Sequence, residues 1–247
     1  MSDALVLSAR ALRLNRRTPD ALVMALALPV ILMVLFVELF GGAIDRGGGY
    51  VQYVVPGVLV LAAAFGSGTT AVAVSSDLAR GVVDRYRSLD VSGSALLAGQ
   101  VAASVARSAV SSVLVVAVAL ALGFRPHAGL GGWLAAAGVL GAFVLAMSWL
   151  SAVVGLLATS PEGASGFTFF VSFLPYASSA FVAVSTLPGW LQGFAAHQPV
   201  SAVVDSLRAL LLGRPAGSAP WEALAWCVAV VAGCVPAAGV LFARRTG

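Results

Sequence analysis

Long stretches of this chain contain no charged residue, and the longest of them covers residues 163–204. The whole chain of 247 residues has 14 arginines, no lysine and 10 acidic residues, so 10% of it is charged and 60% is hydrophobic. A soluble domain has about 25% charged residues. With a mean hydropathy of +0.99, the sequence predicts an all-α, polytopic membrane protein whose residues 1–247 form a single transmembrane domain.

Six apolar runs are long enough to cross a bilayer, which needs about 20 apolar residues for each helix. The six predicted spans are residues 21–40, 53–76, 103–124, 133–157, 167–187 and 223–242. Prolines and glycines break the stretch 188–212, which we expect to form external re-entrant helices packed on protein. A cleavage-like site near Ala25 is discounted, because its apolar run continues to Phe40 and is too long for a signal peptide.

A basic segment, residues 4–18, precedes the first span. On a helical wheel its leucines and arginines fall on opposite sides: Leu5, Leu7, Leu12 and Leu14 against Arg10, Arg13 and Arg17. This pattern predicts an amphipathic helix in the membrane interface. A simpler alternative is that the arginines only bind anionic lipid.

The distribution of arginine predicts the orientation. Residues 77–90 form the only dense polar segment between spans, and placing it in the cytoplasm with both termini and Arg107 puts ten of the 14 arginines inside. The positive-inside rule then gives cytoplasmic N- and C-termini. Arg107 is expected to snorkel to the cytoplasmic surface from the start of the third span.

Several functions are excluded or weakened by the composition. Without lysine the chain cannot be a P-loop ATPase, and the net charge of +4 is explained by membrane orientation without nucleic acid. His127 and His197 lie in external segments, while Cys227 and Cys234 share one span, so neither a metal site nor an intramembrane hydrolase is expected. The predicted spans contain almost no carboxylates, which weakens an ion-coupled mechanism.

Several runs together resemble a known family. They are Leu174 to Gln192, Gln198 to Val200, Asp205 to Gly213, Gly123 to Pro126, Ser160 to Glu162, and Arg80 to Gly99. The chain resembles the type-2 ABC exporter permeases, and within them the actinobacterial daunorubicin-resistance permeases. Ala183 and Asp90 replace prolines that are usual in the family, and Ser104 stands where aspartate is frequent.

The resemblance implies a type V exporter-like half-transporter of a bacterial plasma membrane. Two permease copies, with a homodimer favoured over a heterodimer, would work with two separate ATPase subunits that bind ATP and magnesium. This chain itself would bind no cofactor. Its cargo would be a hydrophobic or amphipathic compound moved out of the cell, such as a drug, an antibiotic or a lipid.

The same resemblance assigns roles to particular residues. A cytoplasmic coupling helix at residues 81–94 would contact the ATPase through Asp84, Arg85, Tyr86, Arg87 and Leu89. An external re-entrant gate would contain Pro188, Gly189, Trp190, Pro199 and Arg208.

Simpler interpretations remain open. The coupling segment could be only a solvated turn. The run Gly66-Ser67-Gly68-Thr69-Thr70 could reflect ordinary close packing of helices. Pro188-Gly189-Trp190 could be a capped turn with an interfacial tryptophan. The phenylalanines of residues 167–173 fit core or lipid-facing positions better than a drug site. For the whole chain, an ion-coupled or passive transporter is the second hypothesis and an intramembrane enzyme the third.

Overall fold

The computed structural model describes residues 19–44, 49–80 and 93–246, and this part of the chain is helical without strands. Its elements are α2 (Pro19–Ile44), α3 (Tyr50–Ala79), α5 (Gly93–Ala121), α6 (Leu130–Leu157), α7 (Pro161–Phe173), η1 (Leu174–Ala177), η2 (Val184–Thr186), α8 (Gly189–His197), α9 (Pro199–Leu211) and α10 (Ala219–Thr246).

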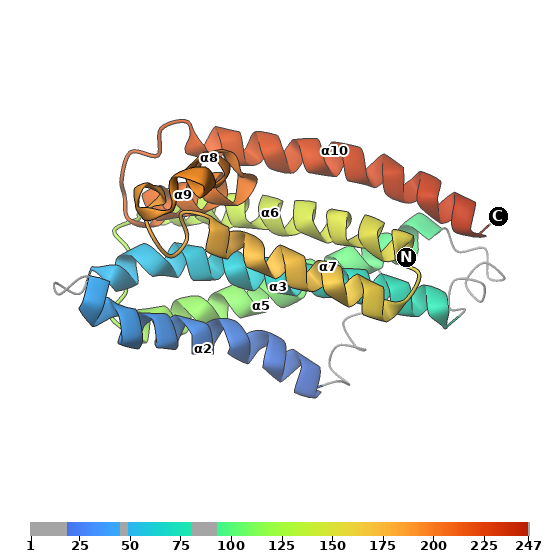
Figure 1. Cartoon of the computed structure of the whole chain (residues 1–247), viewed down its shortest axis with the longest axis horizontal. Helices are drawn as coiled ribbons and strands as arrows, with labels where there is room; N and C mark the ends of the chain where they lie inside the picture. The colour runs from blue at the N-terminus through green and yellow to red at the C-terminus, as the bar shows by residue number, and fades with distance from the viewer. Residues whose placement is uncertain (1–18, 45–48, 81–92, 247) are drawn as a thin grey trace.

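The longer helices run alternately in opposite directions along one bundle (Figure 1). In chain order, the directions of α2, α3, α5, α6, α7 and α10 alternate along the bundle, while the short α8 and α9 lie at one end. At the opposite end α2 begins, α3 ends, α5 begins and α10 ends. The residues on either side of the predicted coupling segment therefore lie far from α8 and α9.

Four of the described helices are long and apolar enough to cross a membrane. These segments are Tyr50–Ala79, Leu96–Ala121, Leu130–Leu157 and Ala219–Arg244, and a shorter apolar stretch lies at Ala27–Leu39 in α2. The described part of the chain is thus all-helical, with four helices of the length and composition that a membrane span requires. The expected spans at 21–40, 53–76, 133–157 and 223–242 fall within α2, α3, α6 and α10.

Helix α3 is the central helix of the bundle. In its most apolar window 78% of the residues are buried, compared with 11% in α10. It contacts α2, α5, α6 and α7, and two of these contacts depend on glycine. A Cβ atom on Gly66 would lie 2.6 Å from Ser108 Oγ of α5, and one on Gly68 would lie 2.8 Å from Thr168 Cγ2 of α7. The small-residue run therefore packs closely against neighbouring helices, as ordinary helix packing in membranes requires.

The fifth predicted span, 167–187, is wrong as a single helix. Helix α7 begins earlier, where the Ser160 hydroxyl accepts a hydrogen bond from Gly163 N–H at 3.2 Å and Pro161 occupies the first turn, a favoured helix start. The helix ends at Phe173 because Pro175 has no N–H for the Val171 carbonyl. That carbonyl accepts from Leu174 instead, and the chain continues as a 3₁₀ turn.

The expected position of Arg107 is also wrong. Helix α5 begins at Gly93, ten residues before the predicted start of the third span at residue 103, so Arg107 lies midway along the helix. Its guanidinium does not reach the helix end but donates hydrogen bonds to α3, to the Gly66 carbonyl at 3.2 Å and to Thr69 Oγ1 at 2.9 Å.

Helices α6 and α3 approach closely at Gly155, which gives a first prediction. A Cβ there would lie 2.5 Å from the Ala71 carbonyl oxygen and 2.9 Å from Val74 Cβ. Gly155→Ala should therefore push the two helices apart and lower the free energy of unfolding by about 1–3 kcal/mol.

Gly141 provides the matched control on the same helix, because a Cβ there meets nothing within 4 Å. Gly141→Ala should leave the stability equal or raise it by up to about 1 kcal/mol. Denaturant unfolding in detergent measures both variants, and equal behaviour of the two would contradict the packing described.

Candidate functional site

The α8–α9 pair covers one end of the bundle, and its sequence explains its shape. Pro188 precedes α8 as its N-cap, and Pro199 is the first residue of α9, a position where a missing N–H costs nothing. One face of α9 is apolar and buried at the helical spacing: Val200, Val203, Val204, Leu207 and Leu211. Asp205 and Arg208 therefore project from a different side of the helix.

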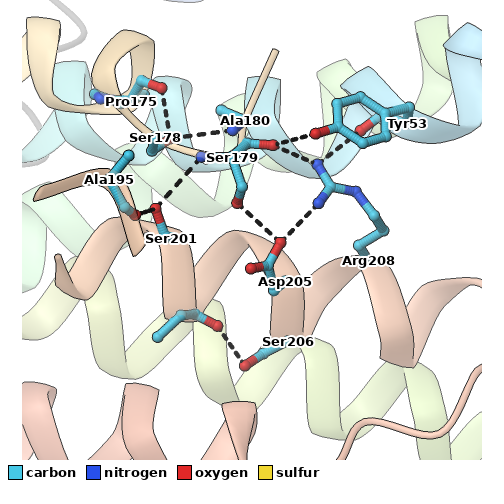
Figure 2. Close-up of polar contacts among 11 residues, drawn as sticks. Tyr53, Pro175, Ser178, Ser179, Ala180, Ala195, Ser201, Asp205, Ser206 and Arg208 are labelled. Atoms are coloured by element: carbon cyan, nitrogen blue, oxygen red, sulfur yellow. Dashed lines mark hydrogen bonds and ion pairs between the residues drawn. The ribbon is translucent and has the colours of Figure 1, made fainter. Parts of the chain in front are cut away.

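Arg208 is the centre of a polar cluster that joins α9, α3 and the loop after η1 (Figure 2). Its Nη1 lies 2.7 Å from Asp205 Oδ1. Its Nη2 donates to the backbone carbonyls of Ser179 at 2.7 Å and Tyr53 at 3.3 Å. One guanidinium thus connects three segments that are distant in the sequence.

Tyr53 and Ser179 complete this cluster (Figure 2). The guanidinium carbon of Arg208 lies 3.9 Å from the centre of the Tyr53 ring, a cation–π geometry. The Tyr53 hydroxyl donates to the Ser179 carbonyl at 2.9 Å, and the Ser179 hydroxyl donates to Asp205 Oδ1 at 2.8 Å. Each member contacts at least two others, so the cluster orients its side chains as a unit.

The loop that carries Ser179 is held on α3 by further contacts. The Tyr50 hydroxyl donates to the Phe181 carbonyl at 3.3 Å, and the Phe181 ring stacks on Phe36 and Tyr176 with centroid distances of 4.6 and 5.0 Å. A Cβ on Gly57 would lie 2.5 Å from the Ala180 carbonyl oxygen. The close approach of the loop therefore requires glycine at position 57.

A turn at the end of α9 lies against the α5–α6 loop. Gly213 has φ +64, the left-handed conformation that commonly ends helices, and Arg214 N–H donates back to the Ala209 carbonyl at 2.9 Å. The His127 N–H donates to the Leu211 carbonyl at 3.0 Å. The α5–α6 loop and the end of α9 are thereby joined.

A cavity of about 620 Å³ adjoins the cluster. Its lining combines aromatic, cationic and small apolar residues: Gly49, Tyr50, Gln52, Tyr53, Phe181, Val182, Ala183, Thr186, Arg208, Leu212 and Arg214. Such a lining suits a molecule with both an apolar body and polar groups. Within the described residues, no three His, Cys, Asp or Glu side chains are grouped to hold a metal ion.

Arg208 carries its positive charge in a largely buried position. Burial lowers the pKa of its guanidinium, and the adjacent Asp205 carboxylate opposes that shift. Since an arginine in a protein does not lose its proton, the cluster keeps a cation at neutral pH. The partner carboxylate is less buried, with 47% of its side chain exposed against 12% for Arg208.

The structure separates the residues predicted for the external gate. Arg208 belongs to the polar cluster, whereas Pro188, Gly189 and Pro199 only begin helices. Trp190 is 82% exposed and takes no part in the cluster. The predicted coupling and interfacial-helix residues lie outside the described part of the chain: Asp84, Arg85, Tyr86, Arg87, Leu89, Arg10, Arg13 and Arg17.

Three cluster members were not predicted as site residues: Tyr53, Ser179 and Asp205. The spacing of Asp205 and Arg208, three residues apart on an amphipathic helix, is a signal that could have found the ion pair. The Ser179 carbonyl accepts from both Tyr53 and Arg208, a role that no residue pattern reveals. The Tyr53 ring and hydroxyl reach the cluster only through tertiary packing.

Comparison with known proteins assigns the class that this helical bundle suggests. Residues 3–212 match the ABC-2 type transporter family, and the chain belongs to that family. It is therefore an integral membrane permease subunit of the ABC transporter class in a bacterium, and not itself an enzyme.

Two relatives have more specific descriptions than the family. Over 206 residues, 83% of this chain and 73% of the relative, it is 34% identical to the daunorubicin resistance ABC transporter permease protein DrrB1 of Streptomyces coeruleorubidus. Over 228 residues, 90% of this chain and 81% of the relative, it is 26% identical to a Mycobacterium tuberculosis protein described as a probable doxorubicin resistance ABC transporter permease protein DrrC.

Proposed function

We propose that this chain is the permease subunit of an ATP-driven exporter that moves a hydrophobic or amphipathic compound out of the cell. The observation that carries the proposal is the match to the ABC-2 type transporter family over residues 3–212. The cavity beside Arg208, with its aromatic and cationic lining, supports an amphipathic cargo. The names of the relatives make anthracycline drugs the first compounds to test.

In this proposal two permease copies, most simply identical, pair with two ATPase subunits that bind ATP and magnesium. The coupling segment at 81–94 would contact the ATPase through Asp84, Arg85, Tyr86, Arg87 and Leu89. Its flanking helices end and begin at the bundle end opposite α8 and α9, as expected if α8 and α9 face the outside.

The full topology is also part of the proposal. Helix α2 and the segment made of α7 with the apolar chain after it, residues 161–187, would add two crossings to the four long spans, giving six, with cytoplasmic termini in the bacterial plasma membrane. The 13 residues of α7 alone are too few for a crossing. Helix α2 begins and α10 ends at the same end of the bundle, which supports an even number of crossings. The α8–α9 pair, with Pro188, Gly189, Trp190, Pro199 and Arg208, would be an external re-entrant gate, and residues 4–18 an interfacial helix whose Arg10, Arg13 and Arg17 contact lipid.

A transport assay tests the function. The chain would be co-expressed with a candidate ABC ATPase subunit, and inverted membrane vesicles would be incubated with ATP and daunorubicin in the outer medium. We expect drug uptake that needs both ATP and the ATPase, together with co-purification of the two proteins. Uptake driven by an ion gradient with this chain alone would instead establish the ion-coupled alternative.

Thiol labelling tests the six-span topology. In a background lacking Cys227 and Cys234, Ser88→Cys should react with an impermeant maleimide only from the cytoplasm and Ser218→Cys only from outside. Ser218 is exposed. It is preferred to the neighbouring Gly217, because the φ of +54 at that glycine would strain a cysteine. Labelling of both sites from the same side would disprove six spans.

A further inference from the structure

Arg107 occupies an exceptional place among the charged residues of the four described spans. It lies at the midpoint of α5, Gly93–Ala121. The other charged residues of those segments, Asp77, Glu222 and Arg244, lie near helix ends. A charged side chain at mid-membrane is costly, and such residues usually take part in function.

The hydrogen-bond partners of Arg107 carry no charge. They are the Gly66 carbonyl and the Thr69 hydroxyl of α3. Within the described residues, the ion pair of an arginine with a carboxylate is that of Arg208, not of Arg107. Asp77, the carboxylate of α3, is bound instead by Gln100 at 2.7 Å, so the positive charge of Arg107 is not neutralised by the described helices around it.

Unused hydrogen-bonding groups lie on the two helices that Arg107 joins. The Nε of Arg107 and the hydroxyls of Ser108, Ser111 and Thr70 are buried without a hydrogen-bond partner in the described structure. Buried polar groups normally have partners. A neutral hydrogen-bond donor would be enough to link α5 to α3. A guanidinium with unpaired donors can in addition bind a carboxylate or a phosphate.

The cation is not sealed inside the bundle. Thr69, its hydroxyl partner, lies on a half-buried stripe of α3 with Phe65 and Val72, one helical turn apart on the same face. A molecule lying along this stripe would place apolar atoms against Phe65 and Val72 and an acidic head beside Arg107. The stripe and the cation together therefore fit an amphipathic anion.

We propose that Arg107, held by the Gly66 carbonyl and the Thr69 hydroxyl of α3, forms a binding site for the oxyanion of an amphipathic molecule, either a carboxylate or a lipid phosphate, at the α3–α5 contact. The site is separate from the cluster at Arg208 and goes beyond the proposed function, because it makes no assumption about the energy source or direction of transport. Its occupant would neutralise a charge that the described helices leave without a counter-ion.

Binding to the full-length chain in phosphatidylcholine nanodiscs tests the site. Three pyrene-labelled probes would be titrated at pH 8 and followed by quenching of tryptophan fluorescence: a fatty acid, the fatty alcohol of the same length, and a phosphatidic acid. Empty nanodiscs supply the background. We expect at least one of the two acidic probes to bind about tenfold or more tighter than the alcohol, as a charge-assisted hydrogen bond would give. The stronger acidic probe identifies the source of the oxyanion.

Variants assign that preference to one residue. Arg107→Gln keeps donors for Gly66 and Thr69 but removes the charge, and should abolish the preference, while Arg107→Lys should keep part of it. Arg125→Gln, at an exposed loop position, should keep it fully. Equal binding of acids and alcohol by the unmodified chain would overturn the proposal even if Arg107→Gln failed to fold, and so would a preference that survives in a folded Arg107→Gln protein.

Discussion

Replacing Arg208 by methionine is expected to lower the free energy of unfolding by about 3 kcal/mol. Methionine keeps much of the length of the side chain but leaves the carbonyls of Ser179 and Tyr53 without their guanidinium donor. The Ser179 carbonyl keeps its hydrogen bond from the Tyr53 hydroxyl, but both carbonyls lose a bond to a charged group, and such a bond contributes about 1.5–3 kcal/mol. Asp205 adds less than a fully buried carboxylate would, because nearly half of its side chain is exposed and water can solvate it.

Arg214→Met is the matched control for this substitution. Arg214 lines the same cavity but is exposed, so its loss should change stability by no more than about 0.5 kcal/mol. Denaturant unfolding of both variants in detergent gives the comparison. If Arg208→Met cost no more than Arg214→Met, the cluster would not hold α9 and the loop on α3.

The second large effect is expected at the proposed ATPase contact. Changing Arg85, Tyr86 and Arg87 together to alanine should remove about 2–4 kcal/mol of binding to the ATPase subunit, the range of interface residues that carry most of the affinity. The reason is their composition, since arginine and tyrosine are enriched among such residues. The permease should still insert and fold, because none of the six predicted spans contains these positions.

Pull-down of the ATPase and ATP-dependent drug uptake measure this effect. Arg125→Ala, which removes an exposed arginine from the α5–α6 loop at the other end of the bundle, should change neither. A solvated turn at 81–94 predicts changes within about 0.5 kcal/mol. Full retention of both pull-down and uptake in the triple variant would therefore support that simpler interpretation.

The sequence was sufficient for the class of fold, because apolar length is a direct physical requirement for crossing a bilayer. It was insufficient for the fifth apolar run, residues 167–187, which does not form a single helix. Hydropathy does not distinguish a helix from an irregular apolar segment. The loop around Phe181 is apolar because it packs on α3 and on the aromatic ring of Phe36 in α2. Pro175 was the local signal that the helix ends there.

The same limit applied to Arg107. The first residues of α5, from Gly93 onward, are less apolar than the rest of the helix, so a hydropathy pattern places the start of the span too late and the arginine too near the surface. The site at Arg208 was found only in part. Its arginine lies in a recognisable run, but the backbone carbonyls that it binds are brought together by tertiary packing.

The central position of α3 also determines the order in which the bundle can be completed. Helix α3 emerges from the ribosome before the partners that fit its glycines and small residues, among them Ser108, Thr168 and Gly155. Until they arrive, the hydroxyls of Ser67 and Thr69 can bond to carbonyls of their own helix, as they do in the finished bundle. Insertion of α3 can therefore precede its packing, and the tight core is a late product of biogenesis that exists only once α6 and α7 have entered the membrane.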